Sequence, residues 1–493
     1  MTNNIARPEE NVELKKIISH AKEYGFVFPS SEIYDGLQAV YDYGPYGVEL
    51  KNNIRTLWWM AMTRLNPNIV GIDAAIFMHP TTWKASGHVD SFNDPMIDNK
   101  DSKKRYRADQ LIEDKVAEYE ANGEAARAQE LTHEMNRLLA KEDFKGIYDL
   151  IVRENITCPV SGTANWTDVR QFNLMFSTQI GSVSDDASLI YLRPETAQGI
   201  FVNFLNVQKT ARMKIPFGIA QVGKAFRNEI VARQFTFRMR EFEQMEMQFF
   251  ICPGEEMKWY EHWKGLRMKW HRAMGIPAGK LKFHDHEKLA HYANAAVDIE
   301  FKFPFGFKEV EGIHSRTDFD LGNHQQFSKK KIQYFDPEVN KSYVPYVVET
   351  SAGLDRLFLM HLSQAYREQE VTENEETKTR IYLDLHPALA PVKAAVFPLV
   401  KKDGLPEIGM KIYEELKSEF NLIYEDSASI GKRYARQDII GTPFCIAVDH
   451  QTKEDQMVTI RDRNTTSQVR VPIAELRKSI AEKVSPGLIL GQL

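Results

Sequence analysis

The chain has little cysteine: three residues among 493, Cys158, Cys252 and Cys445. So few thiols cannot form a disulfide framework, and this composition favours a reducing cytoplasm. The sequence also lacks an apolar run long enough to span a bilayer. Its first residues, MTNNIARPEENVELKKI, are polar and lack the apolar centre of a signal peptide. We therefore expect a cytoplasmic protein that does not bind a membrane.

A strong excess of one charge is also missing. The chain has 63 basic and 68 acidic residues, for a formal net charge of −5. This balance excludes a uniformly basic nucleic-acid binder, but it allows local basic surfaces that contact phosphates. At 493 residues and 43% hydrophobic content, the chain is long enough for two or three globular domains.

Several common catalytic motifs are absent. The sequence has no GxxxxGK[ST] phosphate loop, no GxGxxG after a strand, no HExxH and no GxSxG. Cys158-Pro159-Val160-Ser161-Gly162 has the form of half a zinc ribbon, CPxCG, in which a serine replaces the second cysteine. Residues 98–103 upstream supply no cysteine, and a structural zinc site needs four strong ligands. We therefore expect no zinc.

The most informative segment is AFRNEIVARQFTFRMREFEQMEMQFF, 225–250. We predict strands at 218–229 and 241–250 joined by a charged hairpin loop. Because strand side chains alternate, Phe242, Gln244 and Glu246 should share one face, and Glu243 and Met245 the other. Arginines suit phosphates, carboxylates suit an ammonium or a metal, and an apolar ring suits a base. The charged residues of this segment on which the prediction rests are Arg227, Arg233, Arg238, Arg240, Glu229, Glu241, Glu243 and Glu246.

This combination predicts a site for a nucleotide together with a cationic group. The alternative is a salt-bridged surface hairpin without a ligand.

The rest of the chain divides into regions of different texture. We predict a catalytic domain at 1–366 with a helical insertion around 100–165, a solvated linker or loop at 367–380, and an α/β domain at 381–493. Within the first region we expect helices at 9–24, 47–64, 109–145 and 257–274, a strand at 69–77, strands and turns at 296–348, and a helix from Gly353.

Several segments, in this order, resemble the class II aminoacyl-tRNA synthetases, and among them the homodimeric type of glycyl-tRNA synthetase. The segment FRNE…FRMREFEQME resembles motif 2 of that family, and Gly353-Leu354-Asp355-Arg356 resembles motif 3. The helix 47–64 with the following strand resembles motif 1, a dimer element. The segments at 193–201 and 349–353 are similar to the two other segments of the family's glycine site, and the segment at 86–98 also resembles the family. The resemblance covers nearly the whole chain.

The resemblance implies an α+β fold, with an antiparallel sheet flanked by helices and a C-terminal α/β anticodon-binding domain. The hairpin character of the key segments agrees with an antiparallel sheet. The implied reaction joins glycine and ATP into glycyl-adenylate and transfers the glycyl group to the 3′ end of tRNA(Gly). A homodimer and Mg²⁺ are also implied, with Glu309 as a candidate magnesium ligand and Glu311 as its nearby competitor.

The family's motifs imply roles for individual residues. Arg227 would bridge the glycine carboxylate and the α-phosphate, Arg238 would close over the triphosphate, and Arg356 would clamp the γ-phosphate. The implied ATP-binding set is Arg227, Asn228, Glu229, Phe237, Arg238, Met239, Arg240, Glu241, Phe242, Glu309, Val310, Gly353, Leu354, Asp355 and Arg356, with Phe242 on the adenine.

Glycine needs carboxylates for its ammonium and a wall where other amino acids have a side chain. The resemblance implies that Glu195, Glu246 and Glu349 surround the ammonium, with Ser351 beside the Cα. The implied glycine-binding set is Arg107, Glu195, Phe242, Glu243, Gln244, Met245, Glu246, Glu349, Thr350, Ser351, Ala352 and Gly353. A methyl group then has no room, which excludes alanine.

Two other functions stay open at this point. A synthetase-like binding module would keep the fold and lose the motif arginines and carboxylates, but all of them are present here. A class II synthetase for proline, threonine, serine or histidine would need a different amino-acid pocket. For tRNA phosphates, the C-terminal region offers Lys432, Arg433, Arg436, Arg461 and Arg463 as candidates.

Overall fold

The computed structural model describes residues 12–181, 189–229, 234–286, 289, 293–338, 340–373 and 376–493. The chain forms two compact units. The first unit comprises Met1–Ala74, Thr196–Lys224 and Phe242–Leu493, and the second comprises Ala75–Glu195 and Ala225–Glu241. The chain therefore passes between units within the segments that resemble the glycine site and motif 2.

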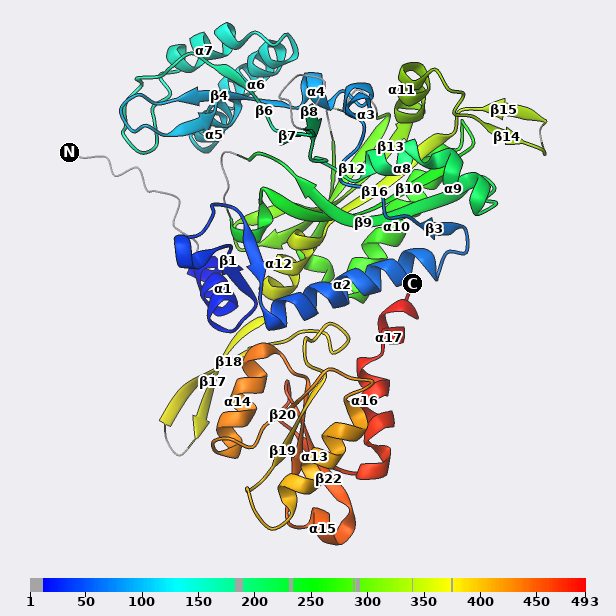
Figure 1. The fold of residues 1–493 in the computed structure, drawn as a ribbon. Coiled ribbons are helices and arrows are strands. Elements are labelled where there is room, and N and C mark those ends of the chain that lie inside the picture. Colours follow the sequence, from blue (N-terminus) through cyan, green and yellow to red (C-terminus); the bar gives the residue numbers. More distant parts are fainter. Residues whose placement is uncertain are drawn as a thin grey trace. The chain divides into compact units, whose positions relative to one another are not determined.

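The first unit is built on a seven-stranded sheet with the order β11-β12-β13-β16-β10-β9-β3 (Figure 1). Neighbouring strands from β11 to β10 are antiparallel, and the short β3 pairs in parallel with β9. The strands are Leu281–Asp285 (β11), Ala295–Phe303 (β12), Gly306–Thr317 (β13), Tyr346–Gly353 (β16), Glu241–Ile251 (β10), Phe217–Phe226 (β9) and Ile69–Gly71 (β3). The predicted antiparallel core is confirmed.

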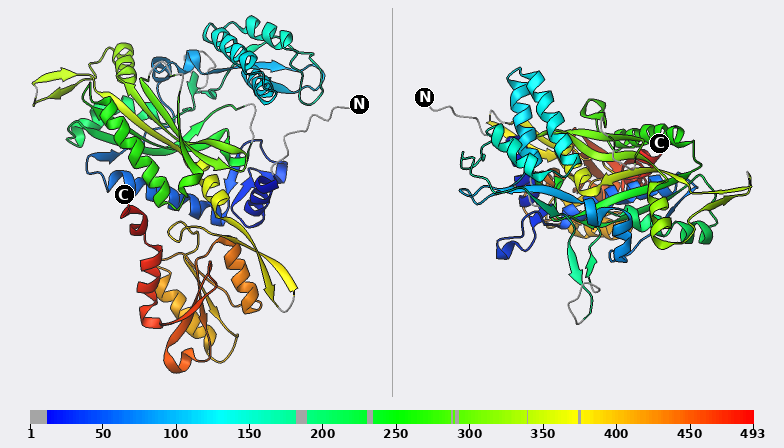
Figure 2. Two further views of the ribbon diagram at one scale, coloured as in Figure 1. Left: turned by 180° about the vertical axis from the view of Figure 1, so that it is seen from behind. Right: turned by 90° about the horizontal axis from the view of Figure 1, so that it is seen from above.

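Three helices, α2 (Pro45–Thr63), α10 (Glu256–Ala273) and α12 (Leu354–Ala365), cover one face of this sheet, as Figure 2 shows from behind. The ring of Phe249 on β10 packs 5.2 Å from that of Trp263 on α10, which ties the helix to the sheet. The prediction of a helix near 47–64 is confirmed. The strand predicted to follow it at 69–77 is shorter and ends at Gly71.

The second unit contains a three-stranded sheet, β5-β4-β6, and a two-stranded sheet, β7-β8. Its three longest helices bury Leu111, Leu131, Met135 and Leu150 in one apolar cluster, so the predicted helical insertion is helical as expected. The elements are Pro80–Ala85 (α3), His88–Ser91 (α4), Asn93–Asp98 (β4), Arg105–Arg107 (β5), Ala108–Ala121 (α5), Ala125–Ala140 (α6), Phe144–Arg153 (α7), Arg170–Asn173 (β6), Ser177–Gln179 (β7) and Leu189–Tyr191 (β8).

Polar contacts surround the half zinc ribbon of the second unit. Cys158 Sγ lies 3.3 Å from Ser102 Oγ and 3.2 Å from the Tyr106 hydroxyl. Asn99 Oδ1 accepts hydrogen bonds from the Ser102 backbone NH (2.9 Å) and from Ser161 Oγ (3.0 Å). Hydrogen bonds from Asn99 and Ser161 therefore join two loops that thiolate ligands would join in a zinc ribbon.

The C-terminal residues of the first unit form a five-stranded sheet, β20-β19-β21-β22-β23, as an α/β region. Helices α13 and α16 pack on one face of it, and α14 packs on the other. The elements are Ala394–Pro398 (β19), Leu405–Leu416 (α13), Leu422–Tyr424 (β20), Ile430–Ile440 (α14), Phe444–Val448 (β21), Thr452–Asp455 (α15), Met457–Asp462 (β22), Gln468–Pro472 (β23), Leu476–Val484 (α16) and Gly487–Leu490 (α17).

Two segments differ from their predicted structure. The predicted solvated linker or loop, 367–380, belongs to an antiparallel hairpin of β17 (Tyr366–Glu373) and β18 (Glu376–Leu383). Its charged composition predicted a loop, but strand pairing satisfies the backbone without a buried core. Within the predicted strands and turns at 296–348, Phe319–Ser328 forms helix α11.

The first unit also contains helix α1 and several short helices and strands. They are Val12–Glu23 (α1), Val27–Pro29 (β1), Tyr41–Tyr43 (β2), Ala197–Val202 (α8), Phe204–Thr210 (α9), Tyr334–Asp336 (β14) and Lys341–Tyr343 (β15). Within the part of the chain that the structure describes, every helix is too short or too polar to cross a membrane.

Candidate functional site

Strand register brings Glu246, Glu349 and Ser351, three of the residues predicted to bind glycine, onto one face of the sheet. Glu246 on β10 pairs with Ser351 on β16, and Ser351 pairs with Gly312 on β13. One row further, Glu349 of β16 lies between Gln248 and His314. Because directly paired residues point to the same side, these side chains form two adjacent rows. The face that carries Glu246 and Glu349 is called the carboxylate face below.

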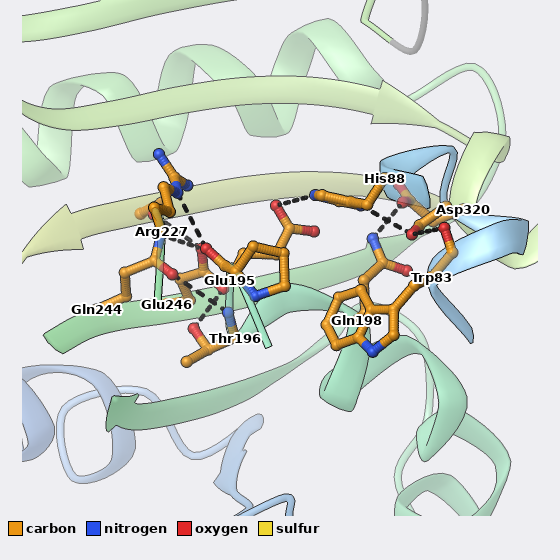
Figure 3. Close-up of polar contacts among 12 residues, drawn as sticks. Trp83, His88, Glu195, Thr196, Gln198, Arg227, Gln244, Glu246 and Asp320 are labelled. Atoms are coloured by element: carbon orange, nitrogen blue, oxygen red, sulfur yellow. Dashed lines mark hydrogen bonds and ion pairs between the residues drawn. The ribbon is translucent and has the colours of Figure 1, made fainter. Parts of the chain in front are cut away.

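Glu246 is buried and accepts hydrogen bonds from three side chains. Thr196 Oγ1 donates to Oε2 at 2.6 Å, Ser351 Oγ donates to Oε1 at 2.9 Å, and Gln244 Nε2 donates to Oε1 at 3.2 Å. Gln244 also accepts from the Thr196 backbone NH at 3.2 Å. Figure 3 shows Thr196 and Gln244 directed at this carboxylate. These contacts fix the carboxylate oxygens in place before any ligand binds.

Glu349 has a more strongly charged environment. Its oxygens accept hydrogen bonds from Gln248 Nε2 (2.6 Å), His314 Nδ1 (2.9 Å) and Arg316 Nη1 (3.4 Å). Burial raises the pKa of Glu349, but Arg316, His314 and Gln248 outweigh it and lower that pKa to about 2. Glu349 is therefore an anion at neutral pH.

The opposite face of β10 and β16 carries other predicted members of the glycine set. Glu243 Oε2 forms ion pairs with Arg55 Nη2 (2.6 Å) and Lys51 Nζ (3.5 Å) of α2. Met245 is fully buried. Thr350 and Ala352 flank Ser351 in sequence and are also fully buried. The side chains of these four residues thus do not join the Glu246 and Glu349 group, as the predicted alternation along β10 implied.

Motif 3 begins helix α12 and divides into a buried part and an accessible part. Asp355 is buried and accepts hydrogen bonds from the Tyr43 hydroxyl, from Lys51 Nζ (2.7 Å) and from the Glu243 backbone NH (2.6 Å). Leu354 is also buried, next to the N-cap residue Gly353. These contacts make Asp355 an anchor of the helix, a role that the resemblance to motif 3 did not predict.

Arg356, the next residue, is partly accessible and forms an ion pair with Glu309. Its Nη1 lies 2.8 Å from Glu309 Oε2 and 3.2 Å from the Glu309 backbone oxygen. The neighbouring Val310 is buried. Glu311, the competing magnesium candidate, is fully buried and bonded to Arg267 (2.5 Å) and His271 (2.8 Å). The structure therefore leaves Glu309 as the better magnesium candidate.

In the second unit, Arg227 follows the end of β9. Its Nε donates to the Pro194 carbonyl at 3.0 Å, and its guanidinium lies 5.4 Å from the centre of the Phe92 ring. Arg240 Nε donates to the Glu229 carbonyl at 2.9 Å, and its own carbonyl accepts from the Arg227 NH. The Asn228 NH donates to the Leu174 carbonyl. Backbone contacts thus hold the Arg227 segment in place.

The loop before β10 is also partly described. Phe237 lies in a 3-10 turn, Phe235–Phe237, and both Phe237 and Met239 are buried. Arg238 and Arg240 are half-buried, as are Glu241 and Phe242 at the start of β10. Arg233, which we grouped with the motif 2 arginines, lies outside the described residues.

Two further predicted residues of the second unit have acidic or basic partners. Arg107 forms ion pairs with Asp109 (2.6 Å) and Asp94 (3.2 Å). Burial raises the pKa of Asp94, and the charge of Arg107 opposes that rise. Glu195 lies 3.4 Å from His88 Nε2, and Figure 3 shows the imidazole directed at the carboxylate. His88 was missed, although it falls inside the segment 86–98 that resembles the family.

Two residues of the carboxylate face were also missed, namely His314 and Arg316 on β13. They are two positions apart on one strand, so their alternation would have placed them on one face, but their register with Glu349 needs the folded sheet.

Most cations proposed for tRNA phosphates have structural roles instead. Arg433 donates to the Pro398 carbonyl (2.7 Å), Arg461 pairs with Asp438 (2.9 Å), and Arg463 donates to the Gly441 carbonyl (2.6 Å). All three arginines are buried. They were wrong predictions, because a sequence does not show which basic side chains fold inward. Lys432 and Arg436 remain exposed on α14.

Three family models match parts of this chain. Residues 179–365 match the tRNA synthetase class II core domain (G, H, P, S and T), and residues 393–483 match the anticodon binding domain. Residues 94–129 and 122–174 match glycyl-tRNA synthetase insertion domain 1. The last match falls on the second unit.

Curated relatives are similar over nearly the whole chain. The glycine–tRNA ligase of Chlorobaculum tepidum is 53% identical over 473 residues, which cover 96% of this chain and all of the relative. That of Staphylococcus haemolyticus is 53% identical over 475 residues, covering 96% of this chain and 99% of the relative.

Among solved structures, prolyl-tRNA synthetase from Cryptosporidium parvum, in complex with L-proline and AMP, has a TM-score of 0.59. It is 12% identical, and the match covers 97% of this chain and 76% of that one, which shows a shared fold alone. The identities of 53%, together with the class II core and its antiparallel sheet, decide the family: the chain belongs to the glycine–tRNA ligases.

Proposed function

We propose that this protein activates glycine with ATP to form glycyl-adenylate and then transfers the glycyl group to the 3′ end of tRNA(Gly). The observation that supports glycine most directly is the carboxylate face, where the small side chain of Ser351 on β16 lies beside Glu246 of the neighbouring strand β10 and two residues from Glu349 on its own strand. An amino acid with an ammonium group and no side chain fits this arrangement.

Glu246 and Glu349 hold the ammonium of glycine in this proposal. Glu349 remains charged because three polar partners lower its pKa to about 2, and Glu246 is oriented by Thr196 and Ser351. A fixed anion binds a cation without the cost of reorienting its oxygens. We keep Glu195 as a further ammonium ligand and Arg107 as a substrate contact, from the resemblance of their segments to the family.

The arginines act on the anionic groups of the reaction. A carboxylate oxygen of glycine attacks the α-phosphorus of ATP, the bond from that phosphorus to the bridging oxygen breaks, and pyrophosphate leaves with the electron pair. Arg227 holds the carboxylate and the α-phosphate, Arg238 covers the triphosphate, and Arg356 binds the γ-phosphate. Positioned cations oppose the repulsion between the two reactants. Phe242 provides a ring for adenine.

Arg356 would have to exchange partners when ATP binds. It now forms an ion pair with Glu309 at 2.8 Å. The carboxylate of Glu309 is partly exposed and offers hard oxygen donors, which fits Mg²⁺. Bound there, Mg²⁺ would supply charge for the phosphates, and Glu309 would be its protein ligand.

The second step moves the glycyl group from the adenylate to a ribose hydroxyl of the tRNA, and AMP leaves. We assign the region 381–493 to anticodon binding, following its match to that domain family. We also propose a cytoplasmic homodimer in which α2 and β3 form the dimer element. Mass photometry of the full chain tests the assembly, and a single species at 56.9 kDa would refute the dimer.

ATP–pyrophosphate exchange measured separately with each of the 20 standard amino acids tests the function. We expect exchange with glycine alone. Exchange with another amino acid would point to a different class II synthetase, and none with any would point to a binding module. Arg227→Ala should abolish exchange, because the variant removes the group that is assigned to bridge the two anions. Near-normal exchange in that variant would refute its assigned role.

A further inference from the structure

A group of side chains of the types that bind metals lies beside the residues proposed to bind glycine, on the same carboxylate face of the sheet. His286, Asp298 and His314 each offer one donor atom, and these atoms all lie within 4.8 Å of one another. Register explains the grouping. Asp298 on β12 pairs with Gly312, which pairs with Ser351, so Asp298 lies two strands from Ser351. At strand spacings near 4.8 Å, that separation is about 10 Å.

The three side chains converge from three neighbouring segments of backbone. His286 directly follows β11, Asp298 lies on β12 and His314 lies on β13. His286 Nε2 is 2.8 Å from Asp298 Oδ2, and the rings of His286 and His314 are 5.9 Å apart. Each donor therefore already lies near the others without a change in the backbone.

The glycine at 312 makes room for this arrangement. A Cβ at that position would lie 3.0 Å from His314 Cε1, 3.3 Å from His314 Nε2 and 3.5 Å from Asp298 Oδ1. The imidazole Nε2 and the carboxylate oxygen thus both border the space above Gly312. A larger residue there would push His314 away from Asp298.

The other nitrogen of His314 is already engaged. Nδ1 lies 2.9 Å from Glu349 Oε1, so Nε2 is directed away from Glu349 and toward Asp298. Histidines that bind metals commonly donate their second ring NH to a carboxylate, which fixes the tautomer and raises the basicity of the ligand nitrogen. Glu349 is the carboxylate that would accept this second ring NH from His314.

We propose that His286 Nε2, a carboxylate oxygen of Asp298 and His314 Nε2 bind one divalent transition-metal ion, with Zn²⁺ as the probe. Two imidazoles and one carboxylate match the ligands of zinc and its neighbours, whereas Mg²⁺ and Ca²⁺ prefer oxygen alone. Three protein ligands leave a position for water. The side chains are 32%, 17% and 15% exposed for His286, His314 and Asp298, so an ion can reach them from solvent.

The ion would influence glycine binding through one hydrogen bond, a consequence that rests on the proposed function of Glu349. A metal on Nε2 holds His314 in the tautomer that donates from Nδ1 to Glu349. It also adds positive charge behind that donor, which draws electron density from the carboxylate. We expect the KM for glycine to differ between the metal-free and the zinc-loaded full chain.

Metal binding is tested directly on the full chain after treatment with a chelator. Isothermal titration with Zn²⁺ should give one site per chain, and Co²⁺ should give visible absorption of a site with nitrogen ligands. His286→Gln and Asp298→Asn should each abolish that site. Glu349→Gln removes the group behind His314 and should weaken binding by about 10–100-fold.

His284→Gln is the matched control, because His284 lies two residues before His286 and its ring is 6.1 Å away, yet it is not one of the three ligands. It should bind Zn²⁺ like the wild type. Absence of a saturable site, unchanged binding in both ligand variants, or equal loss in the control would overturn the proposed ligand set. Thermal unfolding of each variant shows whether it is folded.

The glycine measurement is separate from the metal titration. If Zn²⁺ binds as proposed and the KM for glycine is unchanged, the coupling through Glu349 is wrong, although the site stands. If the protein binds Zn²⁺ and activates no glycine, the proposed function fails and the metal site survives.

Discussion

Glu246 and Glu311 are buried on opposite faces of the central sheet and are held in different ways. On the carboxylate face, Glu246 accepts from Thr196 and Ser351, side chains of the sheet and of the segment before α8. On the other face, Glu311 is bonded to Arg267 and His271 of α10. That face is covered by helices, which bring the cations that neutralise its carboxylates. The comparison shows that burial of a carboxylate does not by itself indicate function.

The packing helix decides the difference. A glutamate under α10 has its oxygens occupied by groups that cannot leave without unfolding the helix. Glu246 on the carboxylate face is oriented by the short side chains of Thr196 and Ser351, which leave room for a ligand beside it. We therefore expect substitutions on the helix-covered face to change stability, and substitutions on the carboxylate face to change glycine binding.

The largest effect is expected for Glu311→Gln. The variant leaves Arg267 buried without its full counter-charge, and breaking a buried pair from one side costs about 3–5 kcal/mol. Urea unfolding followed by tryptophan fluorescence measures it, since the buried Trp263 and Trp270 lie on the same helix. Glu261→Gln, exposed on α10, is the control and should change little. A loss below about 1 kcal/mol for Glu311→Gln would contradict the role assigned to this face.

Glu246→Gln should instead reduce glycine activation. Removing one partner of a buried charge pair costs about 2 kcal/mol or more in binding, which is roughly 30-fold in kcat/KM for glycine. ATP–pyrophosphate exchange measures this loss, and the melting temperature should change little because the amide keeps the shape. Glu243→Gln on the same strand is the matched control, with its partners on α2. Equal losses of exchange in both variants would remove the distinction between the faces.

The helix-covered face should also show a pH dependence of stability. Burial, with the charges of His271 and His386, lowers the pKa of His361 to about 3. In the folded state, His361 is therefore protonated at a lower pH than in the unfolded state, where its pKa is about 6.5. This contribution is present above pH 6.5 and is lost as the pH falls toward 3.

Between pH 7 and pH 5, the free energy of unfolding should fall by about 2 kcal/mol because of His361. His361→Leu removes the titrating group, so its unfolding free energy should fall less over this range than that of the wild type. Urea titrations at both pH values give the comparison. Parallel pH profiles for the two proteins would show that His361 does not titrate as proposed.

The sequence predicted the alternation along β10 because strand geometry is local. Glu246 and Glu243 were assigned to opposite faces from spacing alone, and the hydrogen bonds agree. Helix α11 was missed because FDLGNHQQFS has no strong apolar period. The partners of each face could not be predicted, since Arg267 and Arg316 meet their glutamates only after distant segments pack.

The same limit explains the errors at the C-terminus. Arg433 and Arg463 have the charge that phosphates need, yet they turn inward to cap carbonyl groups. No local pattern distinguishes an arginine that binds RNA from one that satisfies buried backbone. By contrast, Arg356 was placed by a motif, and its partial exposure leaves it available for exchange of partners.

The smallest effect is expected for Ser351→Ala, which sharpens the comparison on the carboxylate face itself. The change removes the 2.9 Å hydrogen bond from Ser351 Oγ to Glu246 but keeps the carboxyl group of Glu246. A single hydrogen bond contributes about 1 kcal/mol net, so the KM for glycine should rise roughly fivefold. Glu246 would then be less well oriented. Exchange kinetics with glycine measure its binding, and exchange kinetics with alanine measure how well alanine is excluded.

Since Thr350 on the opposite face is buried, Thr350→Ser is the control and should affect stability rather than KM. An unchanged KM in Ser351→Ala would mean that the other donors alone orient Glu246, and that Ser351 acts only through its size.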